Sequence, residues 1–278
     1  MKIDVVADEL DREGKLLLEE IEKSGNEGEY VHANDISYFI KEEGIELYNK
    51  NEKYKIPDIL IARSGFTREM GKSGRVFILT LENLGTKIID NVNSILRAQE
   101  KTITAATLIS KKIPYPYTIN LKSKKLLKKI DFSPIVAKPE GGRRGQGVYK
   151  VDSTSEIEDF DSILLQEFIP SNGRDFRVFC VGDKCLGAIS RTSQKKDEWR
   201  SNVALGGKPE VVKLKPEMKK LALKAKKAMG LDIAGVDLIE NNSSYSVLEV
   251  NRSPQFGGFM EATGVNVAKE IIDFVLRQ

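Results

Sequence analysis

Three oxygen-bearing side chains near the end of the chain have the types and spacing of a divalent-metal site. Asp237 is the only charged residue of the apolar segment Gly235–Ile239, and Glu249 and Asn251 lie two positions apart in the next segment. Residues two apart on a strand point to the same face, and a turn between the segments brings Asp237 close to Glu249 in a register that the sequence leaves open. Hard oxygen ligands suit Mg²⁺ or Mn²⁺. The alternative is a set of solvent-facing polar positions on a half-exposed hairpin.

A lysine and a glycine-rich loop suggest that the chain binds an anion. Lys138 lies in the apolar segment Pro134–Pro139, where a buried ammonium group needs an anionic partner. The loop that follows, Glu140–Val148, carries four glycines that let backbone N–H groups approach phosphates. It has neither the Walker A nor the Rossmann pattern. We expect a strand–loop–strand flap over phosphates, and the alternative is an ordinary mobile loop.

Further cations follow in the sequence. They occur in Arg174-Asp175-Phe176-Arg177, at Arg191 and in Arg200-Ser201-Asn202. Strand alternation places Asp175 and Arg177 on one face. Several cations near a metal site suit a triphosphate and an acyl-phosphate. The alternative is a set of surface ion pairs.

Composition excludes several classes of protein. The chain has 278 residues, with 44 Lys and Arg against 41 Asp and Glu, so its net charge of +3 argues against a dedicated nucleic-acid binder. No apolar run reaches the roughly 18 residues of a membrane span. The first residues show a strand pattern without a signal peptide, which predicts a cytoplasmic protein. One histidine and two cysteines exclude His-rich metal sites and a disulfide framework.

The expected elements form three regions. The first is a small α/β domain with a mainly parallel sheet, whose expected strands are Lys2–Ala7, Glu29–Ala33, Ile45–Tyr48, Asp58–Arg63 and Lys87–Asp90, with helices at Asp11–Lys23 and Arg68–Leu84. Arg63 and Arg68 lie at its ligand-facing edge or are ordinary surface arginines. The second has helices from about Ser94 (capped by Asn93) and at Lys101–Lys111, Leu121–Lys129 and Ser153–Phe160, and strands at Tyr117–Asn120, Pro134–Pro139, Val148–Val151 and Ile163–Ile169.

The third region opens with a hairpin around Gly182-Asp183, in which Cys180 faces Cys185. Such a pair could oxidise, although two reduced thiols are the simpler reading. A polar loop, Arg191–Gly207, and a helix over Pro216–Met229 follow. A second hairpin (Gly235–Glu240 with Tyr245–Asn251) and a helix at Asn266–Leu276 complete the region.

In this order the motifs resemble the ATP-grasp ligases, and more narrowly the RimK group, which joins amino acids such as glutamate to carboxylates. The resemblance covers about residues 90–278 and rests on Lys138, the glycine-rich loop, Gln166-Glu167-Phe168-Ile169, Gly173–Arg177, Arg200-Ser201-Asn202, Gly206-Gly207, Gly235-Val236-Asp237 and Glu249–Pro254. It implies an ATP-grasp fold of mixed α/β class, with an N-terminal Rossmann-like domain (1–92), a central lid domain (93–169) and a C-terminal catalytic domain (170–278).

The resemblance also implies roles for individual residues. Lys101 and Lys138 would bind the phosphates of ATP under a loop that includes Gly145 and Gly147. The hinge segment Gln166–Ile169 would meet the adenine, chiefly through the backbone of Glu167 and Phe168, and Asp175 would contact the ribose. Two Mg²⁺ or Mn²⁺ ions would bind Asp237, Glu249 and Asn251. Arg200 and Asn202 would face the reacting carboxylate and the γ-phosphate, and Arg191 would lie on the phosphate or substrate side. Ser201, with Arg200 and Asn202, would also bind ATP.

The implied activity is an ATP-dependent carboxylate–amine ligation through an acyl-phosphate, releasing ADP and phosphate. The added amino acid is expected to be L-glutamate, and the acceptor a protein C-terminus or a glutamyl-bearing cofactor. The alternatives are a carrier-protein ligase of lysine or arginine biosynthesis and a small-molecule kinase. Relatives are often dimers or tetramers. Two departures from the family pattern are Ala204-Leu205 before the paired glycines, where a basic residue is common, and Arg143-Arg144 in the loop.

Overall fold

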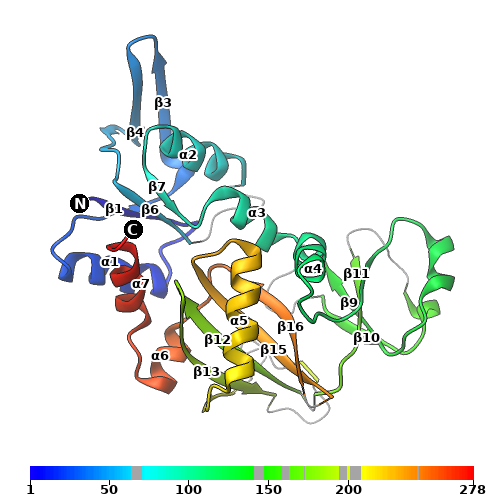
Figure 1. The fold of residues 1–278 in the computed structure, drawn as a ribbon. Coiled ribbons are helices and arrows are strands. Elements are labelled where there is room, and N and C mark those ends of the chain that lie inside the picture. The colour runs from blue at the N-terminus through cyan, green and yellow to red at the C-terminus, as the bar shows by residue number, and fades with distance from the viewer. Residues whose placement is uncertain are drawn as a thin grey trace. The chain divides into compact units, whose positions relative to one another are not determined.

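A computed structural model gives the fold of the chain (Figure 1). It describes residues 1–63, 71–140, 147–157, 163–171, 173–193, 199–200, 208–242 and 244–278. The chain forms two compact units, of which one contains residues 1–95 and 252–278 and the other residues 96–251. None of the described helices combines the length and apolar character that a membrane crossing requires. The predicted division into three domains remains a prediction.

The first unit is built on a parallel sheet with the strand order β2-β1-β6-β7. The strands are β1 (Ile3–Val6), β2 (Tyr30–Val31), β6 (Ile59–Ala62) and β7 (Lys87–Ile89). Every residue of β1 and β6 is buried, as expected for parallel strands covered on both faces. This confirms the predicted α/β sheet.

Helices accompany this sheet. They are α1 (Arg12–Lys23), α2 (Gly71–Asn83), α6 (Gly257–Thr263) and α7 (Val267–Val275), while α3 (Val92–Gln99) runs along the chain from this unit into the second. The Asp11 side chain caps α1 by accepting from the Gly14 amide at 2.8 Å, and α7 packs against α1. Asn91, rather than the predicted Asn93, caps α3, because its side chain accepts from the Ser94 amide at 3.0 Å.

One element of this unit was not predicted. An antiparallel sheet forms from β3 (Ile36–Lys41), β4 (Gly44–Asn49) and β5 (Glu52–Lys53), after a short 3₁₀ turn, η1 (Ala33–Asp35). The sequence indicated only a strand over 45–48. The tip of the hairpin contains Gly44 at φ 146°, a conformation that side chains disfavour.

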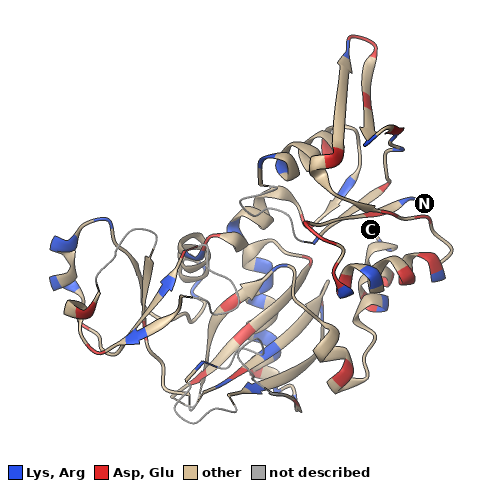
Figure 2. Ribbon diagram, turned by 180° about the vertical axis from the view of Figure 1, so that it is seen from behind, with Lys and Arg blue, Asp and Glu red and all other residues tan. Residues whose placement is uncertain are grey.

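The second unit contains two antiparallel sheets. The first has the order β10-β9-β11-β8 and consists of β8 (Thr118–Asn120), β9 (Ile135–Pro139), β10 (Tyr149–Val151) and β11 (Ile163–Glu167). Its core includes Leu121, Ile135 and Leu165. The predicted lysine-rich helix is a 3₁₀ segment, η2 (Lys124–Lys129), with no buried residue. Blue in Figure 2 marks Lys and Arg along this part of the ribbon. A second 3₁₀ turn, η3 (Thr154–Glu156), begins at a capping box with Ser153.

The second sheet of this unit has the order β14-β13-β12-β15-β16. Its strands are β12 (Arg174–Val181), β13 (Lys184–Thr192), β14 (Lys208–Val212), β15 (Ile233–Asn241) and β16 (Ser244–Asn251). The predicted polar loop after Arg191 is therefore bounded by a paired strand, β14, that the sequence did not indicate. The helices of the unit are α4 (Lys101–Ser110) and α5 (Pro216–Met229), which pack against each other.

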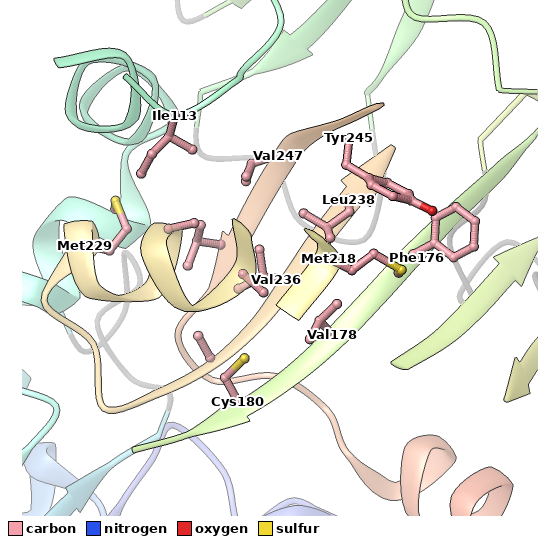
Figure 3. Packing of buried hydrophobic residues seen from close by; sticks show 14 of the residues in the cluster. Ile113, Phe176, Val178, Cys180, Met218, Met229, Val236, Leu238, Tyr245 and Val247 are labelled. Carbon is pink, nitrogen blue, oxygen red and sulfur yellow. The ribbon is translucent and has the colours of Figure 1, made fainter. Parts of the chain in front are cut away.

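Helix α5 covers one face of this sheet and forms the core of the unit with it. Figure 3 shows Val178 and Cys180 of β12, and Val236 and Leu238 of β15, gathered with Met218 of α5. Strand side chains alternate between the two faces of a sheet. Arg177, which directly precedes Val178, and Asp237, which lies between Val236 and Leu238, therefore point to the opposite face.

The cysteine hairpin has the predicted register. Val181 pairs with Lys184 and Cys180 with Cys185 across the Gly182-Asp183 turn. Both cysteines are free thiols, with their Sγ atoms 2.8 Å apart. Cys180 is buried in the core and Cys185 is partly exposed.

Candidate functional site

The predicted metal ligands lie together on the face of the sheet that α5 does not cover. In the register of β15 and β16, Asp237 is directly opposite Glu249 and Gly235 is opposite Asn251, with a bulge after Asp237. The Asn251 Nδ2 atom lies 3.2 Å from Asp237 Oδ2. Asp237 is buried, whereas Glu249 is exposed. The site thus presents two carboxylates and one amide.

Two arginines neutralise the buried Asp237. Arg177 is its register partner on β12, and it donates from Nε to Asp237 Oδ1 at 2.7 Å and from Nη2 to Oδ2 at 2.8 Å. Arg191 Nη2 lies 3.0 Å from Asp237 Oδ2. Burial alone would raise the pKa of Asp237, but Arg177 and Arg191 lower it below its usual value. The carboxylate therefore stays ionised.

Asp175 anchors Arg191 from the other side. The two residues pair across β12 and β13, and Arg191 donates through Nε at 2.7 Å and through Nη2 to the two carboxylate oxygens of Asp175. Burial lowers the pKa of Arg191, but Asp237 and Asp175 outweigh it and raise the pKa above its usual value. The result is a buried network in which Arg191 bridges two acids. Whether Asp175 also contacts a ribose stays a prediction.

Lys138 enters the same region from the other sheet of this unit. Its ammonium group donates to Gln166 Oε1, and Gln166 Nε2 donates to Thr118 Oγ1 at 2.9 Å. Desolvation lowers the pKa of Lys138 to about 8, and Lys101 adds to this effect, while Glu249 and Asp237 oppose it. Burial therefore works against the charged form of Lys138, and a bound anion would favour that form.

Lys101, the other predicted phosphate ligand, begins α4. Its Nζ donates to the backbone oxygen of Glu140 at 2.9 Å, and the Thr102 amide donates to Glu140 Oε1 at 2.8 Å. The second carboxylate oxygen of Glu140, Oε2, is buried and has no hydrogen-bond partner among the described residues. Lys101, Lys138 and this oxygen thus lie around the start of the glycine-rich loop.

Two further residues of the site, Glu140 and Tyr115, were not among the predicted ones. Glu140 directly follows Lys138 and Pro139, so its nearness to that lysine was a usable signal. Tyr115 hydrogen-bonds Gln166, and burial, followed by the charge of Glu249, raises its pKa above the usual value. No local pattern marks Tyr115, which reaches the site only through the pairing of distant strands.

The hinge segment lies at the end of β11. The amides of Glu167 and Phe168 donate to the Tyr117 oxygen at 2.9 Å and to the Pro134 oxygen at 3.1 Å. The Phe168 ring packs edge-on against Trp199 with centroids 5.6 Å apart, and Lys150 Nζ lies 4.9 Å from its centroid. Ile169 is buried. An aromatic pair beside the hinge is a surface on which a flat base can stack.

Two of the residues predicted to surround the phosphates, Arg200 and Gly147, lie at the end of the glycine-rich loop. Arg200 Nη1 donates to the Val148 oxygen at 3.2 Å, next to the end of the glycine-rich loop. Gly147 has φ 69°, and a Cβ there would lie 2.7 Å from Pro139 Cγ, so the position requires glycine. The other predicted residues of this group lie outside the described residues: Gly145, Ser201 and Asn202.

The donor set fits Mg²⁺ or Mn²⁺ bound together with a nucleotide. Two carboxylates and an amide are hard oxygen donors, and Mg²⁺ commonly takes one or two carboxylates plus phosphates. Among the described residues no cluster of three or more His, Cys, Asp or Glu side chains could hold a metal ion. The protein ligands alone would therefore leave the coordination shell incomplete.

Comparisons with known proteins agree on one family. A model described as "RimK-like ATP-grasp domain" matches residues 98–275. The "Probable alpha-L-glutamate ligase" of Legionella pneumophila (strain Corby) is 37% identical over 73% of this chain and 71% of its own. The "Tetrahydromethanopterin:alpha-L-glutamate ligase" of Methanococcus maripaludis is 30% identical over 99% of this chain and 98% of its own.

A solved structure shares the fold. It is the ATP-grasp ligase PsnB complexed with minimal precursor, Mg and ADP, which superimposes with a TM-score of 0.77 at 17% identity and covers 99% of this chain and 96% of that one. These matches confirm the predicted fold class and the predicted kind of enzyme. The chain belongs to the RimK-like ATP-grasp family and is an ATP-using ligase that forms amide bonds.

Proposed function

We propose that the enzyme adds L-glutamate to a carboxylate acceptor through an acyl-phosphate intermediate, releasing ADP and phosphate. The observation that carries this proposal is the similarity to a glutamate ligase over almost the whole length of both chains. That relative is named for a pterin acceptor, and so we place a glutamyl-bearing cofactor, such as a pterin or a deazaflavin, first among the acceptors. A protein C-terminus is the second candidate.

The residues of the site support this chemistry. A carboxylate is a poor electrophile, and phosphorylation gives it a leaving group. The γ-phosphoryl group moves to a carboxylate oxygen of the acceptor, the amine of glutamate attacks the carbonyl carbon, and phosphate leaves as the amine loses a proton. These steps need cations set in advance for the developing charge, and they need no covalent nucleophile. The described side chains of the site are carboxylates, amides, lysines and arginines, the hydroxyl groups of Thr118 and Tyr115 that contact Gln166, and the aromatic rings beside the hinge.

Each predicted site residue keeps its proposed role. Lys101 and Lys138 bind phosphate oxygens under the loop that contains Gly145 and Gly147. Gln166, Glu167, Phe168 and Ile169 hold the adenine, with the aromatic pair of Phe168 and Trp199 at its side, and Asp175 contacts the ribose as well as anchoring Arg191. Arg191, Arg200 and Asn202 orient the reacting carboxylate and γ-phosphate, and Ser201 binds ATP beside them.

Asp237, Glu249 and Asn251 would hold the metal, for which we propose two Mg²⁺ or Mn²⁺ ions. When bound, such ions neutralise phosphate charge and polarise the transferred group. Because burial would otherwise favour a neutral Asp237, the arginines that keep this carboxylate ionised also keep it ready as a ligand.

We also propose three broader features of the enzyme. The predicted domains 1–92, 93–169 and 170–278 would correspond to the N-terminal, lid and catalytic parts of the family. The enzyme would work in the cytoplasm as a homodimer or homotetramer. It would not act on nucleic acid or at a membrane.

A trapping assay tests the function. Mg-ATP and the purified enzyme are mixed with a panel of pterin, deazaflavin, peptide and carrier-protein acceptors, with glutamate or with hydroxylamine in its place. We expect ADP release and a hydroxamate on a cofactor acceptor, and a glutamyl adduct when glutamate is present. Hydroxamate only on a carrier protein would establish the biosynthetic ligase instead. A stable phosphorylated product without hydroxamate would establish the kinase.

A further inference from the structure

The two oxygens of Asp237 are not equally occupied by donors. An ionised carboxylate offers about two lone-pair sites on each oxygen. Oδ2 has three donor atoms within 3.2 Å, from Arg177, Arg191 and the Asn251 amide, whereas Oδ1 accepts from Arg177 Nε at 2.7 Å. A metal ion that bonds Oδ2, or that bonds the carboxylate through both oxygens, must therefore replace a donor, and Arg177 is the residue that donates to both.

The two arginines that donate to Asp237 are fixed to different degrees by their other contacts. Arg191 is 5% exposed and is also bound by both oxygens of Asp175, so its guanidinium is fixed from two sides. The side chain of Arg177 is 17% exposed, and within the described part of the chain Asp237 is the acid to which it donates. Arg177 can move away without leaving a second carboxylate unpaired.

The remaining donor, the Asn251 side-chain amide, can turn from a donor into an acceptor. The Asn251 Nδ2 atom contacts Asp237 Oδ2 at 3.2 Å and the Gly235 backbone oxygen at 3.4 Å. Rotation of the amide by half a turn would present Oδ1 in place of Nδ2. Asn251 can therefore become a ligand where it stands, whereas a guanidinium has no acceptor and can only withdraw.

We propose that Arg177 is a displaceable counter-ion, which occupies the ligating side of Asp237 until a divalent cation with its nucleotide takes that place. Arg191 stays on Asp237 throughout, because Asp175 holds it. This inference rests on the proposed function, since it assumes that Asp237 binds the metal. It assigns Arg177 a positioning role: it keeps the buried carboxylate ionised and in place before the metal arrives.

The test compares Arg177→Met, which removes the guanidinium at similar length, with Arg177→Lys, which keeps one cation. Arg174→Met is the matched control, because Arg174 lies on the same strand and contacts the Phe176 ring at 4.9 Å rather than Asp237. Binding of Mn²⁺ in the presence of ADP is measured by electron paramagnetic resonance. We expect Arg177→Met to bind Mn²⁺ about tenfold more tightly than the wild type, since a charged hydrogen-bonded contact no longer has to be broken. Arg177→Lys should lie between the two, and Arg174→Met should match the wild type.

A second readout does not depend on activity or on the variants' stability. In the wild type, the arginine Nε–H signals are followed by nuclear magnetic resonance while Mg²⁺ and ADP are added. The Arg177 signal should shift and lose its protection from exchange, and the Arg191 signal should stay protected. Weaker Mn²⁺ binding by Arg177→Met, or an Arg177 signal that keeps its protection when the metal is bound, would overturn the proposal. If neither the wild type nor Arg174→Met bound Mn²⁺ and ADP, the proposed function itself would fail.

Discussion

Removing Arg191 should cost this protein far more stability than removing an exposed cation. The Arg191 and Asp175 side chains are 5% and 6% exposed. In Arg191→Met, Asp175 loses the donors to both of its oxygens and Asp237 loses one of its donors. Breaking a buried ion pair by removing one partner costs roughly 3–5 kcal/mol. For a cooperative unit of about 150–250 residues this lowers Tm by roughly 6–20 °C.

Urea denaturation at neutral pH, followed by circular dichroism, measures this loss. The double variant Asp175→Leu/Arg191→Met should be more stable than Arg191→Met alone, because it no longer buries an unpaired carboxylate at position 175. Lys269→Met is the control, since its pair with Asp273 is 60% and 38% exposed and its loss should leave the stability nearly unchanged. If Arg191→Met lost less than about 1 kcal/mol of stability, or if the double variant were less stable than Arg191→Met, the buried network as described would be refuted.

Further expectations concern the lysine, the tryptophan, the thiols and acid stability. The pKa of Lys138 is lowered to about 8, so the free enzyme should lose ATP affinity as pH rises through about 8, and Lys138→Met should bind ATP weakly at every pH in a fluorescence titration. Trp199, the single tryptophan, packs on Phe168, and its emission should change when ATP binds; calorimetric binding with unchanged emission would contradict the hinge assignment. Cys180 and Cys185 face each other, so oxidised dithiothreitol should remove two reactive thiols and two mass units without forming dimers, whereas Cys185→Ser should show no such loss. The pKa of Asp237 is lowered in the folded state, so its contribution to stability is present above the ordinary carboxylate pKa and is lost as pH falls below it. Asp237→Asn should therefore weaken the dependence of stability on pH in the acid range. An unchanged dependence on pH would count against the ion pairs.

Much of the fold followed from local patterns in the chain. The apolar runs at 3–6 and 59–62 predicted buried parallel strands, and the stripe from Met218 to Met229 predicted the helix that covers the second sheet. Strand β14 was missed because Lys208–Val212 contains Pro209, which argues against an internal strand. The sheet accommodates it because β14 is an edge strand. The strand at 45–48 in β4 was predicted, but β3 was missed because Tyr38, Phe39 and Ile40 are three apolar residues in a row, without the alternation that marks a half-buried strand.

The site was predictable in its chemistry but not in its pairings. Alternation placed Asp175 and Arg177 on one face, and the spacing of Glu249 and Asn251 placed those two together. That Arg177 faces Asp237 depends on β12 lying beside β15, a contact between residues 60 positions apart. No local pattern specifies such a contact. Tyr115 joins the site for the same reason, through a tertiary contact with Gln166, whereas Glu140 lies two residues after Lys138 and could have been inferred from that nearness.

The most direct test of the central claim follows the oxygen atoms of the acceptor. The acceptor carboxylate is labelled with a heavy oxygen isotope and incubated with the enzyme, Mg-ATP and glutamate, and the released phosphate is analysed by mass spectrometry. An acyl-phosphate route predicts that one labelled oxygen passes from the carboxylate into phosphate for each amide formed. Unlabelled phosphate alongside amide formation, or label that stays entirely in the acceptor, would contradict the ligase mechanism proposed for this chain.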